Sequence, residues 1–129
     1  MRILLDTHML LWYQSNNPQL SASASALLLD TNNTLLVSAA TWWEMAIKIS
    51  SHKLAIDLST SMAAATRRGI DTLPLQPAHF LRVASLAYPD ENHRDPFDRL
   101  IIAQALTENI PVLTAGDKFD LYVGLQRFS

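Results

Sequence analysis

Short apolar runs, each ending in a polar residue or a turn, recur along this sequence. The runs show no alternation of apolar and polar positions, which is typical of strands buried on both faces of a parallel sheet. The expected strands are Ile3–Leu5, Leu35–Val37, Ile70–Leu75 and Pro111–Thr114, with Gly124–Phe128 as a short edge strand. Longer, mostly apolar segments lie between them and predict helices. The pattern therefore indicates an α/β protein with helices on both faces of the sheet.

The expected helices have recognisable ends. One begins near Met9, and the others cover Leu20–Asp30, Ala39–Ser50, Leu58–Arg68, Ala78–Ala87 and a segment that opens at Asp95 and runs to Leu106. Their expected N-caps include Thr7, Ser21, Ser38 and Asp95. Pro96 follows Asp95 at the first helical position, where proline is favoured, and Gly69 fits a helix C-terminus. These signals place the helix boundaries without any knowledge of tertiary structure.

Composition narrows the class of protein. With 129 residues, 49% hydrophobic and 17% charged, the chain is expected to form a single domain over residues 1–129. It contains no cysteine, which excludes disulfides, thiolate catalysis and cysteine-ligated metals. No apolar run reaches membrane-spanning length, and no signal peptide is recognisable, so a cytoplasmic protein without membrane contact is expected. The net charge of −2 decides little about a nucleic-acid ligand.

Four acidic residues follow strands or begin helices: Asp6, Glu44, Asp98 and Asp117. The carboxyl ends of parallel strands lie at one edge of a sheet, so these acids are expected to converge there. Clustered carboxylates repel one another, and a divalent cation relieves that repulsion. Oxygen ligands favour Mg²⁺ or Mn²⁺, which can lower the pKa of water and stabilise an in-line displacement at phosphorus.

Each acid also has a purely structural explanation. Glu44 lies in an apolar helix and is expected to be buried. The four explanations are a turn cap for Asp6, an ion pair of Glu44 with Lys48, a capping box of Asp98 with Asp95, and a turn of Asp117 beside Gly116. Taken singly, each is at least as good as the functional interpretation. The occurrence of four acids at corresponding points of one fold favours a shared site.

Several segments resemble the signatures of PIN-domain proteins, in particular the VapC-like toxins of prokaryotic toxin–antitoxin pairs. They are Leu4–Trp12, Ser38 with Trp43-Glu44, His93–Ala105 and Val112–Thr114. The resemblance implies a three-layer α/β/α fold with four or five mostly parallel strands. It also implies an endoribonuclease that depends on Mg²⁺ or Mn²⁺, forms a homodimer and is inhibited by a small antitoxin protein.

The same resemblance assigns roles to individual residues. The metal-binding acids would be Asp6, Glu44 and Asp98, whereas Asp95 would be a cap, a supporting group or a substitute ligand. The fourth catalytic acid of the family does not align with an acid in this sequence. The family commonly has Thr-x-Asp, but Thr114 is followed at that position by Gly116, with Asp117 one residue later. A positive φ at Gly116 would turn Asp117 inward, and Thr114 itself could support the site.

Residues outside the acidic group have weaker assignments. Arg94 and Arg99 flank Asp98 and are candidates for contacts to RNA phosphate, with solvated surface positions as the alternative. His8 is expected to pack rather than to bind metal. The tryptophans Trp12, Trp42 and Trp43 are expected in the core or in an antitoxin groove.

Other α/β proteins provide alternatives to a nuclease function. One is a PIN domain that has lost activity and binds RNA or a protein, for which the Gly116 shift is the support. A signalling receiver domain needs paired acids after the first strand, and a dehalogenase-type phosphatase needs an acid at the position of His8. Neither pattern is present, so a metal-dependent ribonuclease is the leading hypothesis.

Overall fold

A five-stranded parallel sheet forms the centre of the molecule. The computed structural model describes residues 1–129 and orders the strands β3-β2-β1-β4-β5, all parallel. The strand bounds are Arg2–Leu5 (β1), Thr34–Ser38 (β2), Asp71–Leu73 (β3), Val112–Leu113 (β4) and Arg127–Phe128 (β5). Chain order reverses beside β1, which pairs with β2 on one side and β4 on the other. Ligands of open α/β sheets bind at such a switch point.

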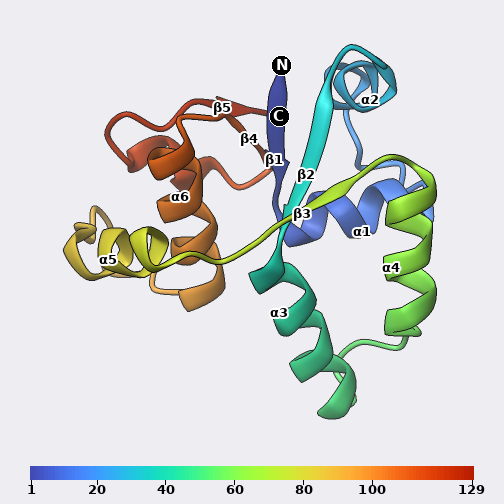
Figure 1. The fold of residues 1–129 in the computed structure, drawn as a ribbon, viewed down its shortest axis with the longest axis horizontal. Helices are drawn as coiled ribbons and strands as arrows, with labels where there is room; N and C mark the ends of the chain where they lie inside the picture. Colours follow the sequence, from blue (N-terminus) through green and yellow to red (C-terminus); the bar gives the residue numbers. More distant parts are fainter.

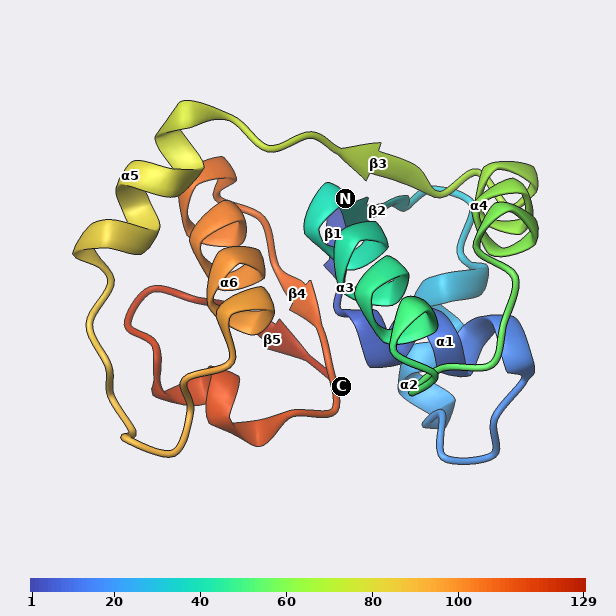
Figure 2. The same ribbon diagram turned by 90° about the horizontal axis from the view of Figure 1, so that it is seen from below.

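Helices cover both faces of this sheet, as the sequence predicts (Figure 1). Their bounds are Thr7–Ser15 (α1), Ala22–Leu29 (α2), Ala39–Ser50 (α3), Leu58–Arg67 (α4), Pro77–Ser85 (α5) and Pro96–Glu108 (α6), followed by the 3₁₀ helix Asp117–Leu121 (η1). Helices α1, α2 and α4 lie on one side of the sheet and α5 and α6 on the other. Helix α3 continues beyond the end of β2, and seen from below it lies between α6 and α1 (Figure 2). The three-layer α/β/α prediction is confirmed.

Alternate residues of the central strand supply two separate cores. Ile3 and Leu5 pack with Met9, Leu10 and other residues on the α1 side, whereas Leu4 packs with Ile101 and Ile102 of α6. All three strand residues are completely buried. The apolar run that identified β1 therefore reflects burial on both faces. Because both sides of β1 are covered, only its carboxyl end can present a polar group to a ligand.

Most helix ends agree with the sequence prediction, with one correction. Ser21, Ser38 and Asp95 accept hydrogen bonds as N-caps, and Gly69 has a φ of 74° after α4. The N-cap of α1 is not Thr7, however, but Asp6, whose side chain accepts from the N–H of Met9. Thr7 is the first helical residue instead, and this frees its hydroxyl for a contact across the site. No helix is both long and apolar enough to cross a lipid bilayer.

Candidate active site

Asp6 lies at the switch point of the sheet. It directly follows β1, and its backbone N–H donates to the carbonyl of Leu113 in β4 at 3.2 Å. The side chain is 5% exposed and is held by the Met9 N–H at 2.8 Å and by the hydroxyl of Thr114. Burial raises the pKa of Asp6, while these hydrogen bonds and His8 oppose that effect. The carboxylate is therefore buried and oriented by the first turn of α1 and by the residue that follows β4.

Glu44 approaches Asp6 from helix α3. The N-cap Ser38 starts this helix directly at the end of β2, and Glu44 is 5% exposed. One carboxylate oxygen accepts from the Thr7 hydroxyl at 2.7 Å, and the other accepts from Lys48 Nζ at 2.9 Å. The expected burial of Glu44 and its ion pair with Lys48 are both confirmed. Thr7 directly follows Asp6 in the sequence, so the position of the Glu44 carboxylate is tied to that of Asp6.

Asp98 completes the group from the first turn of α6. The cap of this helix, Asp95, accepts from the N–H groups of Phe97 at 2.8 Å and of Asp98 at 3.1 Å. The Asp98 side chain is 33% exposed and interacts with His93 at 3.3 Å rather than closing a capping box with Asp95. Partial burial and the neighbouring Asp95 and Asp6 carboxylates raise the pKa of Asp98 to about 6. Asp98 thus lies within electrostatic reach of Asp6.

Asp6 is the member of the group that interacts with both others. The Glu44 carboxylate raises the pKa of Asp6, and Asp6 raises that of Asp98. Asp6 directly precedes α1, Glu44 lies in the second turn of α3, and Asp98 lies in the first turn of α6. The starts of these three helices lie just beyond the lower ends of the strands in Figure 1. No three acidic or histidine side chains are arranged to hold a metal ion as they stand. The donor set nevertheless suits a hard cation, because buried, mutually repelling carboxylates are stabilised by positive charge.

Asp117 does not join this group. It is the exposed first residue of η1, and its side chain makes no hydrogen bond. The positive φ expected for Gly116 is wrong, because this residue has φ −76° and ψ 107°. Its N–H instead donates to Thr114 Oγ1 at 2.9 Å. The glycine backbone therefore supports the threonine that holds Asp6 and does not turn Asp117 toward the acids.

Comparison with known proteins agrees with this arrangement. The family model described as the PIN domain matches residues 3–125, nearly the whole chain. The chain belongs to the PIN-domain family. The VapC-like resemblance is also shown: ribonuclease VapC22 of Mycobacterium tuberculosis is 26% identical over 113 residues, covering 87% of this PIN domain and 85% of the relative.

Solved structures match the fold along its whole length. VapBC2 from Rickettsia felis, solved bound to a DNA fragment from its promoter, has a TM-score of 0.77 at 21% identity. The match covers 99% of this chain and 98% of that one. VapBC-1 from nontypeable Haemophilus influenzae has a TM-score of 0.72 at 21% identity, with 100% and 98% covered. At this identity, these likenesses establish the PIN fold.

Two buried polar residues that were given no role from the sequence, His93 and Tyr122, lie beside Asp98 in this PIN domain. His93 is 8% exposed and lies between Asp98 and the hydroxyl of Tyr122, which is 2.9 Å from Nδ1. Arg99 is 3% exposed, and its guanidinium contacts the Tyr122 hydroxyl. A signal was present in the sequence, since His93 and Arg99 belong to the segment His93–Ala105 that resembles the family. Their burial was not apparent from the segment alone.

The surface position considered for Arg99 is wrong. Its guanidinium donates to the carbonyls of Leu86 and Ala87, each at 2.8 Å, and to the Tyr122 hydroxyl at 3.2 Å. It also lies 3.6 Å from the ring centroid of Tyr88. With these contacts inside the PIN domain, Arg99 is a structural residue and not an exposed phosphate contact. Arg94 is exposed and stays a candidate for that role.

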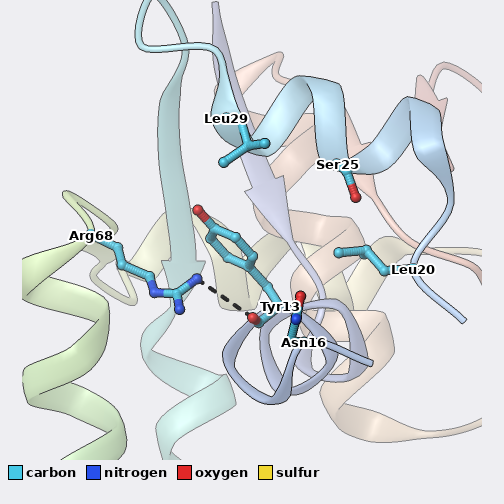
Figure 3. Close-up of a pocket in the computed structure, with 6 residues that line it drawn as sticks. All are labelled: Tyr13, Asn16, Leu20, Ser25, Leu29 and Arg68. Carbon is cyan, nitrogen blue, oxygen red and sulfur yellow. Dashed lines mark hydrogen bonds between the residues drawn. The ribbon is translucent and has the colours of Figure 1, made fainter. Parts of the chain in front are cut away.

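The largest pocket of the PIN domain lies away from the acids. It has a volume of about 410 Å³ and is lined by Tyr13, Asn16, Leu20, Ser25, Leu29 and Arg68. Arg68 closes one side, with its guanidinium 4.4 Å from the Tyr13 ring centroid and a hydrogen bond to the Tyr13 carbonyl (Figure 3). The pocket contains no carboxylate. The switch-point group is therefore the better candidate for chemistry.

Proposed function

We propose that this PIN domain is a Mg²⁺- or Mn²⁺-dependent endoribonuclease and the toxin of a toxin–antitoxin pair. The observation that carries the proposal is the buried Asp6 carboxylate at the sheet switch point, with Glu44 and Asp98 interacting with it from two other helices. Similarity to ribonuclease VapC22 supports RNA as the substrate class. Similarity to VapBC structures supports an antitoxin partner.

Within this proposal, Asp6, Glu44 and Asp98 hold the metal ion. A bound divalent cation neutralises charge on the phosphodiester and lowers the pKa of water at the site. The protein contributes orientation: the Thr114 hydroxyl and the Met9 N–H fix Asp6, and the Thr7 hydroxyl fixes Glu44. Lys48 holds the second Glu44 oxygen and supplies a cation beside the acids, where it can also approach an RNA phosphate.

Exposed apolar side chains near the acids suit the antitoxin and a second protomer. Trp43, beside Glu44 on α3, is 57% exposed and packs edge-on against Phe97 with ring centroids 5.1 Å apart. An exposed tryptophan that packs on a partly buried aromatic ring next to a functional group is typical of a protein interface. Trp42, by contrast, is buried and donates to Thr72 Oγ1 at 3.0 Å, which excludes it from such a groove. The homodimer stays a proposal based on the family resemblance.

A second function, binding RNA or protein without cleavage, is supported by two observations. No three acidic or histidine groups are arranged to hold a metal, and Asp117 is exposed on η1. If the acids cannot move together around a cation, the domain binds its ligand but does not cut it. The two functions differ in whether Mg²⁺ binding and cleavage depend on the same residues.

Incubation of purified protein with labelled RNA distinguishes these functions. Cleavage should require Mg²⁺ or Mn²⁺, stop with EDTA and disappear in Asp6→Asn. The matched control is Asp71→Asn, because Asp71 is an exposed acid on β3 without a hydrogen bond or ion pair from its side chain. RNA binding without cleavage by any of these proteins would support the binding module and overturn the nuclease proposal.

A further inference from the structure

A chain of hydrogen bonds runs from a buried arginine to Asp98. Arg99 Nη1 donates to the Tyr122 hydroxyl at 3.2 Å, this hydroxyl lies 2.9 Å from His93 Nδ1, and His93 Nε2 lies 3.3 Å from Asp98 Oδ2. His93, Arg99 and Tyr122 are each less than 10% exposed. The chain therefore runs through the protein interior and emerges at the half-exposed carboxylate of the proposed site.

The two ends of this chain fix the direction of every hydrogen bond. A guanidinium has no acceptor, so the Tyr122 oxygen accepts from Arg99. An ionised carboxylate has no donor, so His93 Nε2 must carry the proton that it shares with Asp98. In a neutral imidazole, Nδ1 is then an acceptor, and the Tyr122 O–H donates to it. One tautomer of His93 satisfies all the partners, and the other leaves the Nε2–Asp98 contact without a hydrogen.

We propose that Arg99, Tyr122 and His93 are positioning residues that hold the Asp98 carboxylate through a directional hydrogen-bond relay. Hydrogen-bonded partners of metal ligands orient them and tune their affinity, and their loss typically weakens metal binding by about 10–100-fold. The relay deepens the proposed nuclease function, on which its catalytic consequence rests. Its structural claim, a fixed His93 tautomer and a fixed Asp98 orientation, does not depend on RNA cleavage.

The relay connects parts of the chain that are distant in sequence. Arg99 binds the carbonyls of Leu86 and Ala87 just after α5, and Tyr122 follows η1. The His93 ring packs against Phe119 and Tyr122, with centroid distances of 5.6 and 5.5 Å. The first turn of α6 is thus tied to the segments on either side of it. Such a tie holds a ligand more rigidly than the helix cap alone.

Substitution Tyr122→Phe separates the relay from simple packing, because it keeps the ring and removes only the O–H. The matched control is Tyr88→Phe: the Tyr88 ring stacks on Arg99, but its hydroxyl makes no hydrogen bond in the chain. A role in packing alone would leave both variants like the parent. The relay requires that only Tyr122→Phe change His93 and Asp98.

The first readout is the pair of His93 ring-nitrogen resonances, measured by NMR of ¹⁵N-labelled protein without metal at about pH 8. His93→Gln assigns the His93 signals by their absence. The parent and Tyr88→Phe should show His93 with the proton on Nε2 and a hydrogen-bonded Nδ1. In Tyr122→Phe, Nε2 should keep the proton that faces Asp98, and the Nδ1 resonance should move to that of a ring nitrogen without a hydrogen bond. His79 is an internal control, because its Nδ1 accepts from the Gln76 N–H at 3.0 Å and does not involve Tyr122.

The second readout is Mg²⁺ affinity by calorimetry, with RNA cleavage kinetics beside it. Tyr122→Phe should weaken Mg²⁺ binding by about tenfold and lower kcat with little change in KM for RNA. An unchanged His93 Nδ1 resonance in Tyr122→Phe would overturn the relay, and a changed Nδ1 resonance with unchanged Mg²⁺ affinity would overturn the positioning of Asp98. If the parent cuts no RNA while both physical readouts change as expected, the relay stands and the nuclease proposal fails.

Discussion

Asp6 and Asp117 follow the ends of two adjacent parallel strands, yet their environments are opposite. Asp6 comes immediately after β1, caps α1 and is 5% exposed. Asp117 comes four residues after the end of β4 and is exposed on η1. The position directly after β4 belongs to Thr114, whose hydroxyl donates to Asp6. Of the residues after β1 and β4, only those that directly follow a strand, Asp6 and Thr114, therefore meet at the switch point.

The largest expected effect comes from replacing the two acids in turn. Asp6→Ala should reduce Mg²⁺-dependent RNA cleavage by more than about 100-fold, because it removes the central carboxylate of the site. Asp117→Ala should reduce it by less than about tenfold, since Asp117 is exposed and contacts none of the acids. Initial rates under identical Mg²⁺ concentrations measure both. Equal losses of activity in the two variants would show that Asp117 moves into the site, contrary to its exposed position on η1.

Removing the Thr114 hydroxyl tests the contact between the two strand ends. Thr114→Val preserves shape but leaves the buried Asp6 carboxylate without one donor, so the free energy of unfolding should fall by about 1–3 kcal/mol. Thr107→Val is the matched control, because the Thr107 hydroxyl is buried without a hydrogen-bond partner and its loss should be neutral or stabilising. Urea titration measures both variants. A Thr114→Val protein as stable as the parent would argue against this role of Thr114.

Asp98 supplies a prediction with a defined pH dependence. Because its native pKa is raised from 3.8 to about 6, the native state binds more protons than the unfolded state between these values, and this contribution to stability is lost as the pH rises through about 6. Without metal, Asp98→Asn should therefore stabilise the protein at pH 7 by about 1 kcal/mol, allowing for solvent screening. The gain should vanish near pH 4.

Thermal unfolding of Asp98→Asn and the parent across that pH range measures this effect. Asp117→Asn is the exposed control and should change stability by less than about 0.5 kcal/mol throughout. A gain for Asp98→Asn that does not depend on pH would mean that repulsion among the carboxylates is not its cause.

The smallest effect is expected at Gly116, where the family commonly has its fourth acid. The φ of −76° permits any residue, but an added Cβ would lie 3.3 Å from Thr114 Oγ1. Gly116→Ala should therefore disturb Thr114 slightly. Gly116→Asp should be more active than Gly116→Ala by less than about fivefold, because it adds a partly exposed charge near the site. Identical cleavage rates for the two variants would show that an acid at position 116 does not contribute to catalysis.

The parts of the structure that could be predicted from sequence depend on local signals. Unbroken apolar runs identified the strands, and Ser21, Ser38 and Asp95 marked helix starts, because a cap acts within one turn of its own helix. The proximity of Asp6, Glu44 and Asp98 could be predicted because strand ends and the helices that follow them meet at one edge of a parallel sheet. Thr7 was predicted in place of Asp6 as the N-cap of α1, because threonine and aspartate both cap helices.

The remainder depends on contacts between distant segments. An arginine in the first turn of a helix ordinarily faces solvent, and the burial of Arg99 requires carbonyls after α5 and a hydroxyl after η1. Likewise, a glycine permits positive φ without requiring it, so the conformation of Gly116 follows from its hydrogen bond to Thr114. No local sequence pattern predicts the relay or the exposure of Asp117.

A crystal grown with Mn²⁺ shows whether the acids at the end of β1 hold a divalent cation, as we propose. Anomalous diffraction locates the ion without reference to activity. We expect Mn²⁺ bound to the Asp6 carboxylate together with Asp98 or Glu44, and no Mn²⁺ there in crystals of Asp6→Asn. A fully occupied Mn²⁺ site elsewhere, with none at Asp6 in the parent protein, would contradict the account.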